Sequence, residues 1–256
     1  MRIAALADLH YTRTSRGQFD ELFRHASGEA DVLLLCGDLT DYGLTEEAEL
    51  LAEDLQRTVD VPVVAVLGNH DYESGHPEEV KHLLTECGLL LLDGDACELD
   101  GVGFAGAKGF AGGFGRGALS PWGEPAIKQF VQAAVDEALK LETALSRLKT
   151  RYRVVVLHYS PIEGTVIGEP REIFPYLGCS RLEEPLKRYP VDVVFHGHAH
   201  RGAPEGVTEA GVPVYNVSVA TLKAAYPDRL PIRFLEIGKG SQGRTAPAPS
   251  ASAPGR

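Results

Sequence analysis

Five apolar segments of this chain stop abruptly, and Asp, Asn or His follows each of them at once. Runs of three to five apolar residues are too short for helices of the usual length and are typical of buried strands. The five segments are residues 3–7, 32–36, 63–67, 154–157 and 193–195. The residues that follow them are Asp8-Leu9-His10, Gly37-Asp38, Gly68-Asn69-His70-Asp71, His158 and His196-Gly197-His198-Ala199-His200. Because such strands deliver residues from one end of a sheet, we expect these polar side chains to converge.

The stretches between these strands predict an α/β fold. Amphipathic segments alternate with apolar runs in the first half, which indicates βα units and a mainly parallel sheet. Helices are expected at residues 17–27, 45–58, 77–87 and about 124–150, and further strands at 89–92, 96–99, 102–105, 212–217 and 232–237. Two turn signals, Asp93-Gly94-Asp95 and Asp100-Gly101, predict hairpins between the short strands from residue 89 to residue 105.

Length and composition favour one globular domain followed by a tail. The chain has 256 residues, of which 44% are hydrophobic and 24% charged, ordinary values for a globular protein. We expect the domain to span residues 1–237. Residues 238–256 consist mainly of Gly, Ser, Ala, Pro and Thr, and this composition predicts a disordered tail.

The charge balance and the cysteines restrict partners and location. The net charge of -11 argues against a long nucleic acid as substrate, although metal ions in an acidic pocket can still attract a small anion. No apolar run approaches the ~20 residues that a membrane span requires. The four cysteines form no CxxC pair, and the first strand leaves no room for a signal peptide, so we expect a cytoplasmic protein without a membrane partner. The oligomeric state is not predicted.

The residues after the strands form a donor set for metal ions. Two aspartates, an asparagine and up to five histidines offer the mixed oxygen and nitrogen ligands that first-row metals prefer. Taken alone, an Asp or Asn in such a place is more often a helix cap or a turn residue. The combination at five strand ends favours two ions that share a bridging carboxylate and lie about 3.5–4 Å apart.

The blocks around Asp8, Asp38, Asn69, His158 and His198 resemble, in the same order, the five blocks of the calcineurin-like metallophosphoesterase family. The resemblance implies a four-layer α-β-β-α sandwich with two mixed β-sheets. It also implies two divalent ions, either Mn or mixed Fe/Mn or Zn, and a metal-bridging hydroxide that attacks phosphorus in line. By this resemblance one ion is held by Asp8, His10 and His200, the other by Asn69, His158 and His198, and the bridge is Asp38.

The resemblance also implies catalytic roles for two further residues. His70 is expected to stabilise the transition state or protonate the leaving oxygen, with Asp41 orienting its ring. His196 is expected to support the site rather than to bind a metal.

Departures from the family pattern indicate the substrate. Relatives that act on phosphoproteins carry Arg and Glu where this chain has Tyr42 and Asp71, so the sequence favours a phosphodiesterase acting on a small or nucleotide-like substrate. The alternatives are a phosphomonoesterase with the same centre, a nuclease and a catalytically silent scaffold. Cap elements are expected at residues 106–150 and 159–179, where candidates for contact with the substrate are Lys108, Arg116 and Arg171. A flexible surface connection is the alternative interpretation of the glycine-rich loop at 106–117.

Overall fold

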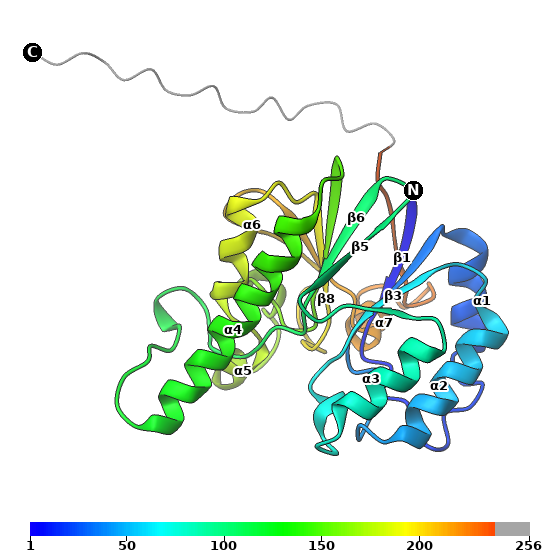
Figure 1. The fold of residues 1–256 in the computed structure, drawn as a ribbon, viewed down its shortest axis with the longest axis horizontal. Helices are drawn as coiled ribbons and strands as arrows, with labels where there is room; N and C mark the ends of the chain where they lie inside the picture. The colour runs from blue at the N-terminus through cyan, green and yellow to red at the C-terminus, as the bar shows by residue number, and fades with distance from the viewer. Residues whose placement is uncertain (239–256) are drawn as a thin grey trace, which may run out of the picture.

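A computed structural model describes residues 1–238, which form two β-sheets packed face to face between outer helices (Figure 1). The expected four-layer α-β-β-α arrangement is thus confirmed. The tail predicted at 238–256 lies, apart from Gly238, outside the described residues.

The first sheet contains the strands of the amino-terminal half. Its order is β11 (Arg233–Glu236), β1 (Arg2–Leu6), β2 (Val32–Cys36), β3 (Val63–Val66) and β4 (Leu90–Leu91). All neighbours are parallel except β11, which runs antiparallel to β1. The outer face is covered by α1 (Asp20–Glu29), α2 (Thr45–Thr58) and α3 (Pro77–Glu86), which lie to the right in Figure 1.

The second sheet has parallel strands at its centre and antiparallel strands at both edges. Its order is β5 (Asp95–Leu99), β6 (Val102–Gly106), β7 (Tyr152–Val156), β8 (Val193–His196), β10 (Pro213–Asn216) and β9 (Glu205–Val207). It is covered by α4 (Pro125–Arg147) and α6 (Glu184–Arg188), to the left in Figure 1. The short helices are α5 (Phe174–Leu177) and α7 (Val219–Ala225), with 3-10 turns η1 (His70–Tyr72), η2 (Gly115–Gly117), η3 (Glu163–Thr165), η4 (Arg171–Ile173) and η5 (Ser180–Glu183).

The strands are apolar on both faces because both faces are buried. Along β1, Ile3 and Ala5 pack in the layer between the sheets, whereas Ala4 and Leu6 pack in the layer beneath α1 and α2. Phe104 and Phe195, both fully buried, fill the space between the sheets from the second side. Parallel sheets covered on two sides have this continuous apolar pattern, which is why the short runs could be recognised in the sequence.

One of the two predicted hairpins is present. Asp100 and Gly101 both have positive φ and join β5 to β6 as an antiparallel pair, as expected for an Asp-Gly turn. The prediction of a hairpin at Asp93-Gly94-Asp95 is wrong. There β4 joins the first sheet beside β3 and β5 joins the second, so this turn carries the chain from one sheet to the other.

Two further features bear on the sequence predictions. The first helix begins at Asp20 rather than at residue 17, because Gly17 adopts a φ of +74° in a turn. Among residues 1–238, no helix combines the length and the apolar composition required to cross a membrane.

Candidate metal centre

The structure brings the seven predicted metal ligands together from both sheets. The loops after β1, β2 and β3 carry Asp8, His10, Asp38 and Asn69, and the loops after β7 and β8 carry His158, His198 and His200. Parallel strands of the two sheets end at the same side of the molecule. The centre therefore lies across the junction between the sheets.

Six of these residues form two overlapping groups with donor atoms within 4.8 Å of one another. One group is Asp8, His10, Asp38 and His200, and the other is Asp38, His158 and His198. Asp38 belongs to both, as a bridging carboxylate must. The seventh residue, Asn69, joins the second group because its Oδ1 lies 2.9 Å from Nε2 of His158.

Several ligands adopt an uncommon backbone conformation. Asp8, His10, Asp38 and His198 have φ values of 61°, 46°, 49° and 70°, in the left-handed region. Residues held in sparsely populated regions cost about 1–3 kcal/mol each and persist where the surroundings impose them. The loops thus turn sharply at the strand ends, which directs these side chains into the centre rather than along the sheet.

The glycine that precedes two of the motif residues is required by close packing. A Cβ on Gly68 would lie 2.1 Å from Oδ1 of Asp38, and one on Gly197 would lie 2.8 Å from Oδ2 of Asp8. Both contacts are shorter than real Cβ atoms make. These glycines let the loops of different strands approach closely enough for one ion to contact both.

Hydrogen bonds fix the orientation of three imidazoles. Nδ1–H of His10 donates to the Asp41 carboxylate (3.0 Å), Nδ1–H of His158 donates to the Cys36 carbonyl (3.0 Å), and Nε2–H of His198 donates to the Tyr176 carbonyl (3.1 Å). Each ring then presents its other nitrogen to the centre. This is the arrangement by which proteins hold histidine ligands of metals.

The electrostatics of the group also fit a cation. Burial alone would raise the pKa of Asp38, but the neighbouring His158 imidazole and the His70 N–H outweigh this effect and lower the pKa below its usual range. Burial opposes protonation of His158, yet the Asp38 and Asp8 carboxylates raise its pKa to about 9. Nε2 of His10 is buried without a hydrogen-bond partner among the described residues. Metal ions would compensate the carboxylates and use this free nitrogen.

The sequence predicts that Asp41 orients His70, but the Asp41 carboxylate forms its hydrogen bond with His10 instead. The Asp41 Oδ1 lies 3.0 Å from His10 Nδ1 but 3.7 Å from His70 Nδ1. His70 instead donates its Nδ1–H to the backbone carbonyl of Asp41, at 2.7 Å. Nε2 of His70 has no hydrogen-bond partner among the described residues, so it is available to a substrate beside the centre.

His196 lies behind the centre with both ring nitrogens engaged. Its Nδ1–H donates to the Gly197 carbonyl, and its Nε2 accepts from the Thr165 hydroxyl, both at 2.8 Å. Burial lowers the pKa of His196 to about 4, so the ring is neutral near pH 7. This arrangement agrees with a supporting role and leaves no nitrogen free for a metal.

The sequence analysis missed the role of Asp71 in holding the ligand loops together. Its buried carboxylate accepts hydrogen bonds from the backbone N–H of Leu39, Thr40 and Gly68 and from the Thr40 hydroxyl, at 2.6–3.2 Å. It therefore connects the loop that carries Asp38 to the loop that carries Asn69. A local signal was available, because Asp side chains commonly bond to backbone groups of nearby residues, including those three positions earlier.

Of the three predicted substrate contacts, Lys108 lies next to the centre. It lines a cavity of about 490 Å³ together with the predicted ligand Asn69. Its ammonium lies 5.0–5.2 Å from the ring centroids of Tyr72, Phe110 and Tyr159 and donates to the Gly109 carbonyl. Burial lowers the pKa of Lys108.

Arg116 and Arg171 line a different cavity. It measures about 410 Å³, has Phe114 and Phe174 in its wall, and contains no predicted metal ligand. The structure thus brings these two arginines together, but separately from Lys108.

A four-layer α-β-β-α fold, with two donor groups that share one aspartate at the strand ends, defines the class of the binuclear metal-dependent hydrolases. The sequence profile of the calcineurin-like phosphoesterase family matches residues 1–202, and the chain belongs to this family. It is therefore a phosphoester hydrolase whose family uses a dimetal centre.

Solved structures share this fold. The phosphopantetheinyl hydrolase PptH from Mycobacterium tuberculosis is 15% identical with a TM-score of 0.67, and the alignment covers 95% of this chain and 98% of that one. A putative 5'-nucleotidase from Staphylococcus aureus, solved in complex with alpha-ketoglutarate, is 17% identical with a TM-score of 0.52; the alignment covers 84% of this chain and 48% of that one. No curated protein sequence matches the chain.

Proposed function

We propose that this phosphoester hydrolase is a phosphodiesterase acting on a small substrate, with two Mn ions, a mixed Fe/Mn pair or Zn at the centre. Asp8, His10 and His200 would hold one ion, and Asn69, His158 and His198 the other. Asp38, which belongs to both donor groups, would bridge them. When bound, the ions supply a hydroxide nucleophile near neutral pH and polarise the phosphoryl oxygens.

In this proposal His70 acts on the leaving group. The hydrogen bond from its Nδ1 to the Asp41 carbonyl fixes the ring and leaves Nε2 free for a substrate. A protonated Nε2 donates to the oxygen that leaves phosphorus and so neutralises the charge that develops there.

The charge of the cavity beside Asn69 is the observation that carries the preference for a diester. Two ammonium groups line this cavity, and Lys140 is paired with Asp93 and Glu137 at 2.8 Å. Lys108 forms no ion pair among the described residues. Because Asp136 and Glu137 line the same cavity, its four charged side chains carry no net charge, which suits the single negative charge of a phosphodiester better than the two of a monoester at neutral pH.

The size and walls of the same cavity support a small organic leaving group. The rings of Tyr72, Phe110 and Tyr159 surround Lys108, and a cavity of about 490 Å³ is of the size that binds small molecules. A base or another flat group can stack on such rings. The similarity in fold to a phosphopantetheinyl hydrolase and to a putative 5'-nucleotidase adds phosphopantetheinyl compounds and nucleotides to the substrates to be screened.

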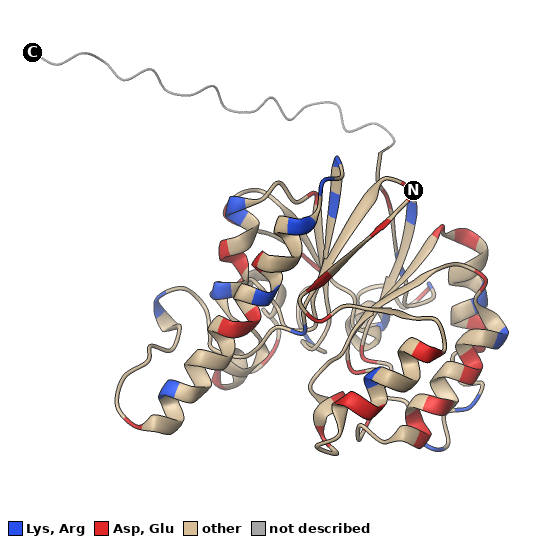
Figure 2. Cartoon of the chain, viewed as in Figure 1, with Lys and Arg blue, Asp and Glu red and all other residues tan. Residues whose placement is uncertain are grey.

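A long nucleic acid is a less favourable substrate. Figure 2 shows acidic residues along α2 and α3, which flank the loops of the first sheet, and the net charge is -11. Phosphate backbones bind to basic surfaces. We therefore rank the nuclease below the phosphodiesterase and the phosphomonoesterase.

The test compares bis(p-nitrophenyl) phosphate with p-nitrophenyl phosphate as substrates of the Mn²⁺-loaded protein. We expect the kcat/KM for the diester to exceed that for the monoester at least about tenfold, a difference of about 1.4 kcal/mol in transition-state binding. Lys108→Met should reduce the kcat/KM for the diester, whereas Lys149→Met, at an exposed lysine after α4, should not. A higher value for the monoester would identify a phosphomonoesterase, and fewer than two bound ions with no turnover would identify a silent scaffold.

A further inference from the structure

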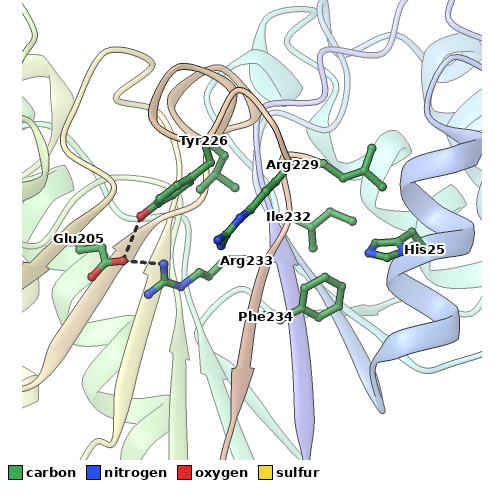
Figure 3. A pocket seen from close by; sticks show the side chains of 9 residues that line it. His25, Glu205, Tyr226, Arg229, Ile232, Arg233 and Phe234 are labelled. Carbon is green, nitrogen blue, oxygen red and sulfur yellow. Dashed lines mark hydrogen bonds and ion pairs between the residues drawn. The ribbon is translucent and has the colours of Figure 1, made fainter.

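A second cavity, of about 670 Å³, lies where the edges of the two sheets approach each other. It is lined by α1 of the first layer, by β11 at the edge of the first sheet, by α7 and by β9 at the edge of the second sheet (Figure 3). None of its lining residues is a predicted metal ligand or a candidate contact of the substrate. The cavity is therefore separate from the centre described above.

One side of this cavity is polar and carries a net positive charge. Glu205 accepts hydrogen bonds from Arg233 (2.6 Å) and from the Tyr226 hydroxyl (3.2 Å), so the charge of Arg233 is compensated. The Arg233 guanidinium also stacks 4.1 Å from the centroid of Tyr215, which fixes its position. Arg229 is different: within residues 1–238 its guanidinium has neither an ion pair nor a hydrogen bond and only approaches the Tyr226 ring at 6.0 Å.

The other side of the cavity is apolar and presents flat surfaces. Figure 3 shows Ile232, Phe234 and His25 opposite Glu205 and Tyr226, with the Arg229 side chain directed between the two sides. The rings of His25 and Phe234 meet edge to face at 5.6 Å. Arg2 covers Phe234 at 4.8 Å, so this ring is held in place. Leu222 of α7 is almost fully buried behind the cavity.

We propose that this cavity binds a small anion with a flat apolar body, such as an aromatic carboxylate. The apolar side would cover the ring, and Arg229 would pair with the carboxylate. The exposed guanidinium of Arg229 can bind a carboxylate through charge-assisted hydrogen bonds, which are roughly twice as strong as those between neutral groups. The volume lies within the range of small-molecule sites. This site is independent of the proposed phosphodiesterase activity.

The test is calorimetric titration of the metal-loaded protein with 2-naphthoate and with its neutral isostere 2-naphthylmethanol. We expect 2-naphthoate to bind at least about tenfold more tightly than the alcohol. Arg229→Gln should remove this difference by weakening 2-naphthoate about tenfold while the alcohol is unaffected. The matched control is Arg151→Gln, which removes another exposed arginine beside a tyrosine ring, Tyr152, outside the cavity, and should change neither affinity.

Three results would overturn the proposal. They are the absence of binding, equal binding of the acid and the alcohol to the unaltered protein, and equal binding of the acid to the unaltered protein and to Arg229→Gln. The last result is also the one expected if the carboxylate binds at the metal centre, because Arg229→Gln leaves that centre intact.

Discussion

At the scale of single residues, the sequence predicts which residues interact, whereas the structure shows which of their atoms make the contact. The sequence predicted that Asp41 orients His70, and the two residues are in contact. The backbone carbonyl of Asp41 makes that contact, however, while its carboxylate holds His10. Spacing in a motif predicts that residues meet, but the choice between two oxygens of one residue depends on the turn that the loop makes.

The carboxylate of Asp41 should therefore control metal binding rather than proton transfer. In Asp41→Ala, Nδ1 of His10 loses its acceptor, so the ring is no longer oriented toward Asp38. We expect the affinity for Mn²⁺ to fall about 10- to 100-fold, as measured by titration with metal analysis. His70→Ala is the contrasting variant: it should lower turnover and keep both ions. Equal metal affinity in Asp41→Ala and the unaltered protein would contradict this role.

The buried neutral ring of His196 predicts a loss of stability in acid. Its pKa is about 4 in the folded protein and about 6.5 in the unfolded chain, so between these values only the unfolded chain takes up this proton. The free energy of unfolding should thus fall as the pH decreases, by about 2 kcal/mol between pH 6.5 and 4.5 from this group. Urea unfolding of chelator-treated protein at both pH values checks this prediction. In His196→Asn the free energy of unfolding should depend less on pH. In the control His82→Asn, at an exposed histidine, its pH dependence should be unchanged.

At the scale of strands and loops, the sequence predicted well those elements that are buried on both faces. The strands β1, β2, β3, β7 and β8 carry the ligands and were recognisable because parallel strands between two layers are apolar throughout. The turn at Asp93-Gly94 was misassigned although its residues suit a hairpin. Leu90 and Leu91 pair with β3, and no local pattern shows which sheet a two-residue strand will join.

The close packing of the ligand loops makes Gly68 sensitive to a single methyl group. In Gly68→Ala the new Cβ meets both the side chain and the backbone nitrogen of Asp38, at 2.1 and 2.2 Å, so the bridging carboxylate has to move. We expect loss of metal binding and a lower free energy of unfolding, by about 1–3 kcal/mol. Metal analysis and urea unfolding measure the two effects.

Gly28→Ala is the matched control for this prediction. Gly28 lies in the last turn of α1, where an added Cβ meets nothing within 4 Å. There Ala should raise the free energy of unfolding by about 0.5–1 kcal/mol, because it favours the helix. Full metal binding by Gly68→Ala would contradict this prediction, because it would show that the loops can move apart to accommodate the added methyl group.

At the scale of the whole molecule, metal binding should contribute to stability. Ions that bind only the folded protein raise its free energy of unfolding by about 2.7 kcal/mol at a free concentration 100 times the Kd. Adding Mn²⁺ to chelator-treated protein should therefore raise the unfolding midpoint, measured by thermal or urea denaturation. Asp38→Asn should lose most of this gain, whereas Asp60→Asn, distant from the centre, should retain it. Equal gains in both variants would show that the ions bind elsewhere.

The sequence could not predict the cavity between α1, α7 and β11, because it exists only where two sheet edges meet. Residues from His25 to Phe234 contribute to it, and none belongs to a recognisable motif. Sequence patterns identify residues that lie together in the chain or at equivalent strand ends. A site formed by the packing of separate layers requires the structure.

The distribution of ligands over the two sheets has a mechanical consequence. The first sheet supplies Asp8, His10, Asp38 and Asn69, and the second supplies His158, His198 and His200. Bound ions would therefore link two layers that apolar contacts and a few hydrogen bonds, such as that from His158 to the Cys36 carbonyl, already join. The layers could then separate at this end of the molecule only when the ions are released. Amide protons near the ends of β1 and β8 should therefore exchange together, and more slowly once the ions are bound.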